Sequence, residues 1–134
     1  MAKSQFINVG SLRPVGNAWV IQEQFVYHSE LLGRRITVPH GFVTDLASVP
    51  KIVPRFIVDV ATGKNRKAAI IHDPLCLDEF KRKYGISQYQ ADLVFREALM
   101  VCGVKKWQAN ILYTAVAAYQ WSKFKGDYWR VPTL

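Results

Sequence analysis

The sequence predicts an α+β domain in which a small antiparallel sheet from the N-terminal half is packed by about three helices from the C-terminal half. Residues 18–45 alternate apolar and polar side chains at period two and are interrupted by glycine and proline, as strands and turns are. Beyond residue 65 the apolar residues recur at helical spacing. Strands followed by helices are typical of α+β folds, and 134 residues that are 50% hydrophobic suit a single domain over residues 1–134.

The predicted strands come first along the chain. Residues 18–28 place mostly apolar side chains at odd positions, which indicates a strand with one buried side. Gly33 supplies a turn, after which residues 34–38 are rich in β-branched side chains and are expected to return as a hairpin partner. Residues 40–45 form a shorter predicted strand.

Three helices are predicted in the second half. Asn65 can cap a short helix that ends at Asp73, because Pro74 disfavours helical geometry in the residue before it. A second helix begins at the capping box Ser87–Gln90 and stops at Gly103. The third runs from about residue 105 to 122 and is apolar on most sides, so we expect it to be the central core element.

The basic charge lies in the second part of the chain. The net charge is +8; residues 1–50 hold four basic and three acidic residues, and residues 51–134 hold fourteen and seven. Such a surface suits nucleic acid, an anionic membrane or polymer, or an acidic protein. Basic residues beside helix ends are common surface residues, and no known nucleic-acid-binding motif accompanies them. The candidate anion- or partner-binding residues are Lys81, Arg82, Lys83, Lys105 and Lys106.

Several functional classes have no support in the sequence. Phosphate-loop, dinucleotide-binding, serine-hydrolase and zincin motifs are absent. No apolar run reaches roughly 18 residues, and the N-terminus lacks the apolar core of a signal peptide. We therefore expect a protein without a transmembrane segment that is not exported, with Cys76 and Cys102 as free thiols.

A set of polar residues in apolar surroundings provides the candidate site. Carboxylates and imidazoles serve both divalent metals and general acid–base catalysis, so the catalytic and metal-ligand candidates are Asp45, His72, Asp73 and Asp92. Structural roles compete with these: Asp45 and Ser48 can cap turns, Asp92 can pair with Arg96 on a solvated helix face, and His72 can be a core histidine.

A cysteine nucleophile is a further, weaker hypothesis. Cys76 follows His72 by four residues, a spacing that would place a thiol beside an imidazole on a helix. Pro74 is expected to interrupt the helix and so to keep the two side chains from facing each other.

Three segments resemble a family of small phage and prophage proteins catalogued as domain of unknown function 1353. They are residues 41–50 (GFVTDLASVP), 69–73 (AIIHD) and 91–99 (ADLVFREAL), and the resemblance spans roughly residues 38–121. It implies a viral origin but no reaction, and the family's recurring polar positions correspond to Thr44, Asp45, Ser48, His72, Asp73 and Asp92. The family often has a tyrosine soon after its His-Asp pair, where this chain has Cys76.

We therefore expect a virion-associated or tail-assembly component, located in the virion or the host cytoplasm, that binds other phage proteins and needs no cofactor. Its polar set would then be a structural hydrogen-bond network rather than a catalytic centre. Two alternatives remain open. One is a metal-dependent hydrolase that uses a divalent ion on an anionic cell-envelope or nucleic-acid substrate, and the other is a basic nucleic-acid-binding module.

Overall fold

The computed structural model describes residues 3–44 and 55–133, with side chains described from residue 65 in the second range. It confirms the α+β class, with strands in the N-terminal half and helices in the C-terminal half. The strands form two small antiparallel sheets rather than one, and four α-helices are present where about three were predicted. Asp45 and Ser48 lie outside the described residues.

The first sheet has the strand order β1-β4-β5, formed by Gln5–Asn8, Phe25–Ser29 and Arg34–Val38. The hairpin predicted across Gly33 is confirmed, since Phe25 pairs with Val38 and Ser29 with Arg34. The second sheet has the order β2-β3-β6, formed by Ser11–Val15, Ala18–Glu23 and Val43–Thr44.

The single strand predicted over residues 18–28 is wrong, because the chain passes from one sheet to the other at Gln24. Ile21 in β3 and Phe25 and Tyr27 in β4 are all buried, so the alternation of apolar residues continues across the break. The period-two alternation of apolar residues indicates which side chains face the core, but it does not indicate where the chain leaves one sheet for another.

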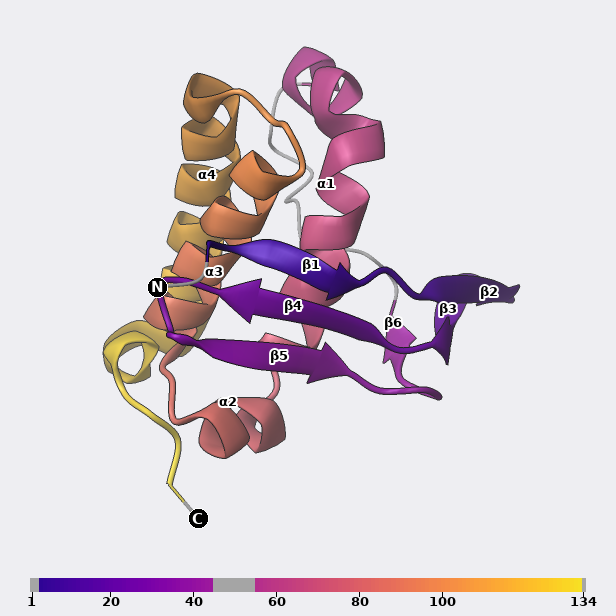
Figure 1. Cartoon of the computed structure of the whole chain (residues 1–134). Coiled ribbons are helices and arrows are strands. Elements are labelled where there is room, and N and C mark those ends of the chain that lie inside the picture. The colour runs from indigo at the N-terminus through magenta and orange to yellow at the C-terminus, as the bar shows by residue number, and fades with distance from the viewer. Residues whose placement is uncertain (1–2, 45–54, 134) are drawn as a thin grey trace.

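The helices pack on one side of the first sheet. They are α1 (Arg55–Leu75), α2 (Asp78–Tyr84), α3 (Gln88–Val101) and α4 (Lys106–Phe124), followed by a short 3-10 helix, η1 (Lys125–Trp129). Figure 1 shows α1, α3 and α4 behind the strands and α2 beyond the β5 edge. Over the described residues, none of these helices combines the length and hydropathy needed to cross a bilayer.

The first helix is longer than predicted at both ends. Asn65 lies inside α1 rather than at its N-cap, and the helix continues through Pro74 to Leu75. A proline so near the C-terminus removes a single helical hydrogen bond, which the last turn tolerates. The chain then tightens, as the backbone N–H of Cys76 bonds the carbonyl of Asp73 at 3.1 Å.

The helix predicted after Ser87 is confirmed together with its capping box. The Ser87 side chain accepts from the Gln90 backbone, the Gln90 side chain accepts from the Ser87 backbone, and Gly103 follows the helix with a φ of 90°. The extent of α4 also agrees with the prediction, but its place as the central core element is wrong. Trp107 and Trp121 on α4 are 53% and 50% exposed, whereas α3 buries seven of its residues between α1, α4 and β4.

Gly10 lets the chain pass between the two sheets. A Cβ at this position would press against the carbonyl oxygens of Glu23 and Gln24, where β3 gives way to β4. We expect Gly10→Ala to lower the free energy of unfolding by about 1–3 kcal/mol through this overpacking, as measured by urea denaturation. Gly126→Ala is the matched control: its Cβ would meet nothing within 4 Å, so a loss equal to that of Gly10→Ala would contradict the explanation.

Candidate active site

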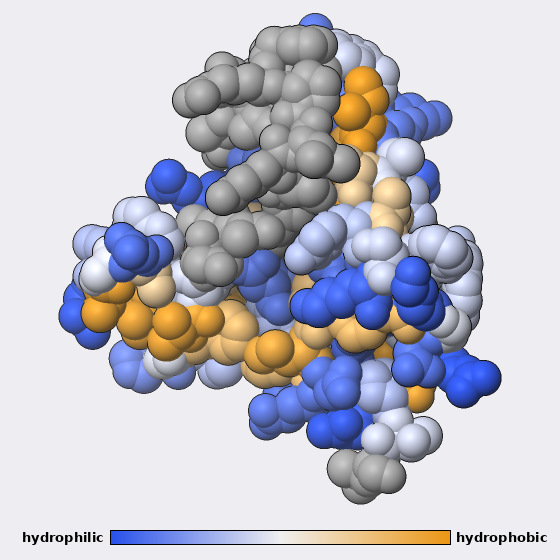
Figure 2. All heavy atoms as spheres, turned by 180° about the vertical axis from the view of Figure 1, so that it is seen from behind, coloured by the Kyte–Doolittle hydropathy of each residue, from blue (hydrophilic) through white to orange (hydrophobic). Residues whose placement is uncertain are grey.

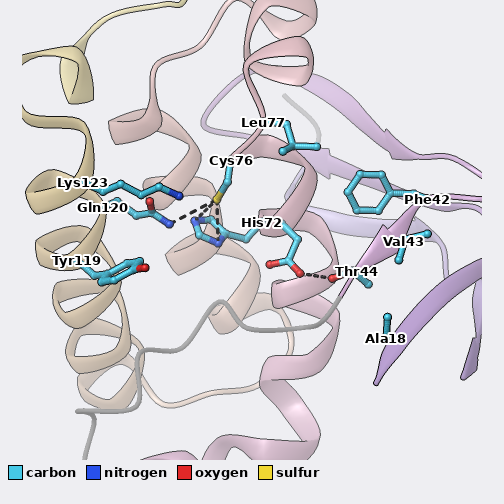
Figure 3. Close-up of a pocket in the computed structure, with 11 residues that line it drawn as sticks. Ala18, Phe42, Val43, Thr44, His72, Cys76, Leu77, Tyr119, Gln120 and Lys123 are labelled. Atoms are coloured by element: carbon cyan, nitrogen blue, oxygen red, sulfur yellow. Dashed lines mark hydrogen bonds between the residues drawn. The ribbon is translucent and has the colours of Figure 1, made fainter. Parts of the chain in front are cut away.

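A pocket of about 500 Å³ opens between the C-terminal end of α1, strand β6 and α4 (Figure 3). Its walls are largely apolar, and its polar members include an imidazole, a thiol, an amide and an ammonium group. The lining residues are Ala18, Phe42, Val43, Thr44, His72, Asp73, Cys76, Leu77, Tyr119, Gln120 and Lys123. Figure 2 shows a band of hydrophobic side chains across the face opposite to that of Figure 1, and the lining residues Val43 and Leu77 are themselves 59% and 48% exposed.

His72 and Cys76 face one another, contrary to the expectation from Pro74. The Cys76 Sγ atom lies 3.7 Å from Nδ1 and 3.6 Å from Nε2 of the His72 ring. Because α1 continues through Pro74, residues four apart stay on one side of the chain. The thiol is half-buried at the pocket wall, and the imidazole is fully buried beneath it.

Asp92 holds the imidazole from the other side. Its Oδ1 lies 2.6 Å from His72 Nε2, and both side chains are fully buried. The hydroxyl of Tyr128 donates to Oδ2 of Asp92 at 2.8 Å. Burial and the charge of Asp92 raise the pKa of Tyr128, so the phenol keeps the proton that it donates.

The sequence alternative that paired Asp92 with Arg96 on a solvated face is therefore wrong. Arg96 instead bonds Asn110 Oδ1 at 3.5 Å and lies over the ring of Tyr113. The i,i+4 spacing was compatible with an ion pair, but Asp92 points into the core toward α1 and η1.

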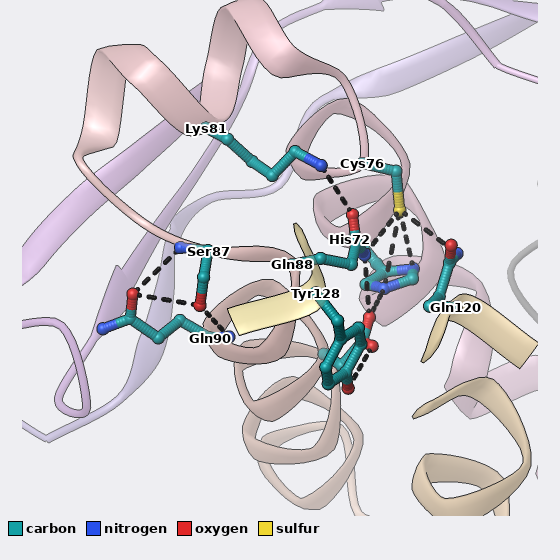
Figure 4. A network of polar contacts seen from close by, with 9 residues as sticks. His72, Cys76, Lys81, Ser87, Gln88, Gln90, Gln120 and Tyr128 are labelled. Atoms are coloured by element: carbon teal, nitrogen blue, oxygen red, sulfur yellow. Dashed lines mark hydrogen bonds and ion pairs between the residues drawn. The ribbon is translucent and has the colours of Figure 1, made fainter. Parts of the chain in front are cut away.

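Two amide groups point hydrogen-bond donors at the sulfur. Gln88 Nε2 lies 3.4 Å and Gln120 Nε2 lies 3.7 Å from Cys76 Sγ. Gln88 Nε2 also donates to Asp92 Oδ1 at 3.0 Å, while its Oε1 accepts from Lys81 Nζ at 2.9 Å (Figure 4). This arrangement of donors suits a sulfur that carries negative charge.

The surroundings of His72 favour its protonated form. Burial of the ring by itself lowers its pKa, but the charges of Cys76 and Asp92 and the hydrogen bonds to both outweigh burial. The pKa of His72 is therefore raised well above its ordinary value of 6.5.

The remaining polar candidates form a second pair at the pocket. The hydroxyl of Thr44, on β6, donates to Oδ2 of Asp73, on α1 (Figure 3). The described members of the predicted polar set thus form two pairs, His72 with Asp92 and Thr44 with Asp73, while Asp45 and Ser48 lie outside the described residues. Over the described residues, no group of three or more His, Cys, Asp or Glu side chains is placed to hold a metal ion. The metal hypothesis stays a prediction that elemental analysis tests, because Asp45 belongs to the proposed ligand set.

The basic candidates differ in exposure. Lys81 is 1% exposed, with Nζ over the ring of Phe124 at 4.1 Å and 3.6 Å from Asp78 Oδ1, so it is not part of an exposed anion-binding surface. Arg82 is half-buried, whereas Lys83, Lys105 and Lys106 are exposed.

Sequence reasoning missed three residues of the site: Gln88, Gln120 and Tyr128. For Gln88 and Gln120, helical spacing in the sequence could have indicated a buried position. Gln88 precedes Asp92 by one helical turn, and Gln120 continues the row of Leu112 and Val116 on the buried face of α4. A glutamine at an apolar helical position is expected to have a buried partner, and here that partner is Cys76.

A family model for proteins of unknown function (DUF1353) matches residues 19–116. This range holds both residue pairs, Cys76 and Gln88, whereas Gln120 and Tyr128 lie beyond its end. Neither a curated protein nor a solved structure matches the chain.

The pKa of His72 predicts a measurable titration. We expect the imidazole nitrogens, followed by NMR, to titrate above pH 6.5, and Asp92→Asn to lower the midpoint by removing the negative charge. Because the pKa is raised in the folded state, this group's contribution to stability is complete below about pH 6.5 and is lost as the pH rises through the raised value.

Asp127→Asn is the matched control for that titration. Asp127 is 77% exposed and pairs with Arg130, so its removal should leave the His72 midpoint in place. A wild-type midpoint at or below 6.5 would contradict the assignment.

Proposed function

The chain belongs to the DUF1353 family of proteins of unknown function, and we propose that it is a thiol-dependent acyl hydrolase. Cys76 is the nucleophile, His72 is its acid–base partner, and Asp92 orients the imidazole. The observation that carries the proposal is the continuous contact from thiol to imidazole to buried carboxylate at the wall of a pocket.

The three side chains meet the general requirements of an activated nucleophile. A nucleophile needs a base within reach, and the base needs a third group that fixes its orientation. Asp92 engages Nε2 of His72, and Nδ1 and Nε2 lie 3.7 Å and 3.6 Å from Sγ, so the imidazole ring is within reach of the thiol for proton exchange. Because Asp92 is fully buried and bonded at both oxygens, it holds the ring firmly.

The reaction has two balanced steps. The Cys76 thiolate attacks the substrate carbonyl carbon, a C–S bond forms, and the bond to the leaving group breaks as His72 gives that group a proton. Water then attacks the thioester, His72 takes up a proton from the water, and the free acid leaves the restored thiolate. No further oxidant or reductant is required.

The pocket walls favour an acyl group with apolar character. Ala18, Phe42 and Leu77 line the cavity, and a volume of about 500 Å³ accommodates a small-molecule acyl group or a peptide side chain. An enzymatic role differs from the assembly role that the sequence predicts, because the thiol and the imidazole lie in contact across Pro74.

A role in phage assembly stays a prediction of the resemblance. One feature favours a protein partner: Trp107, Ile111 and Trp121 are exposed and lie along the outer face of α4. Aromatic residues in such a position are typical of protein interfaces. Sedimentation of the protein with candidate phage partners, compared with the Trp107→Ser variant, tests this role independently of the thiol.

Acetylation by p-nitrophenyl acetate tests the proposed chemistry. We expect release of p-nitrophenolate with an acetyl group on Cys76, located by peptide mass spectrometry. His72→Gln should slow this acetylation by about 10²- to 10⁴-fold, because it removes the acid–base group. Cys76→Ser should abolish it.

Cys102→Ser is the matched control. Burial raises the pKa of the Cys102 thiol, and this cysteine does not line the pocket, so its replacement should leave the rate unchanged. Acetylation on Cys102 alone, or at an equal rate in folded His72→Gln protein, would contradict the proposal.

A further inference from the structure

We propose that Gln120 is a catalytic residue that donates a hydrogen bond to the oxyanion formed when Cys76 attacks an acyl carbon; this inference rests on the proposed function. Gln120 lies on the last turns of α4, lines the pocket and has its Nε2 atom 3.7 Å from Cys76 Sγ. No sequence motif pointed to it.

The position of Nε2 suits this role. In the tetrahedral intermediate the negative oxygen is two bonds from the sulfur, so a donor that already approaches the sulfur from the pocket wall can reach that oxygen. Side-chain amides serve as oxyanion donors in acyl transfer when they are placed before the reaction. Gln88 also points Nε2 at the sulfur, but it does not line the pocket and its amide is shared with Asp92 and Lys81.

The orientation of the Gln120 amide has a structural cost. Oε1 of Gln120 is buried and has no hydrogen-bond partner, and it is the one such side-chain atom in the described part of the chain. A buried amide with one unpaired end destabilises the folded state compared with an apolar residue of similar shape. Turning the amide over would place Oε1 against the sulfur, an electron-rich group, and would withdraw the donor from it.

The nitrogen that points at the sulfur and the unpaired oxygen of the same amide together indicate that Gln120 serves chemistry rather than folding. An apolar residue at position 120 would fill the same space next to Leu112 and Val116 on the buried face of α4 without leaving an unpaired oxygen. Functional sites commonly hold groups that lower stability. Gln120 therefore acts on the reacting carbonyl, whereas its contribution to folding is neutral or unfavourable.

Two reagents separate the oxyanion role from a general effect on the thiol. Acetylation by p-nitrophenyl acetate passes through a tetrahedral oxyanion, whereas alkylation by iodoacetamide displaces iodide at a saturated carbon and forms none. We expect Gln120→Leu to slow acetylation of Cys76 by about 10²- to 10³-fold and to change alkylation of the same thiol little. The ratio of the two rates is therefore the measured quantity.

Control variants make the result specific. Gln108 is also a buried glutamine on α4 but does not line the pocket, so Gln108→Leu should leave the ratio unchanged. Thermal melting of Gln120→Leu should give a Tm no lower than that of the wild type. If this variant does not fold, Gln120→Met removes the amide with an unbranched side chain of similar length.

The outcomes distinguish the two proposals. If acetylation and alkylation fall equally in Gln120→Leu, or if neither falls, Gln120 is not the oxyanion donor, while Cys76, His72 and Asp92 keep their roles. If wild-type Cys76 is alkylated but never acetylated, the acyl-hydrolase proposal itself fails, and the role of Gln120 fails with it.

Discussion

Asp92 is a carboxylate with no exposure to solvent, and the arrangement of the helical half depends on satisfying it. A buried charge is tolerated when its oxygens receive hydrogen bonds and a counter-charge is near. Its three donors come from different elements: His72 from α1, Gln88 from the same α3 helix one turn earlier, and Tyr128 from η1. The carboxylate thus ties the end of α1 and the C-terminal segment to the central helix, and α1 and α3 both supply partners of the sulfur.

Lys81 determines how the rest of the cluster is oriented. Its ammonium group can only donate hydrogen bonds, so the Gln88 oxygen must face it and the Gln88 nitrogen must face Asp92 and Cys76. Burial lowers the pKa of Lys81, and proximity to Asp78 opposes this effect. The Lys81 ammonium group therefore fixes the Gln88 nitrogen toward the sulfur. The electrostatic setting of the nucleophile is therefore built from α2 and α3 as well as from α1.

The local features of this fold could be predicted from sequence, whereas features that depend on packing between distant segments could not. The Ser87 capping box and the Gly33 hairpin are short-range patterns, and both appear as predicted. The strand break at Gln24 was hidden because apolar alternation continues across two sheets. His72 and Asp92 stood out as polar residues in apolar helices, but their direct contact required the packing of α1 on α3. The contact of Cys76 with His72 could not be predicted, because a proline disrupts the middle of a helix but is tolerated in the last turn, where Pro74 lies.

The distribution of polar groups in the core supports a chemical rather than a structural reason for the cluster. A network meant only to hold the helices together would be more stable with every group satisfied or with apolar residues in its place. Here the polar groups converge on one sulfur at a pocket wall, and Gln120 leaves an oxygen unpaired while it points its nitrogen at that sulfur.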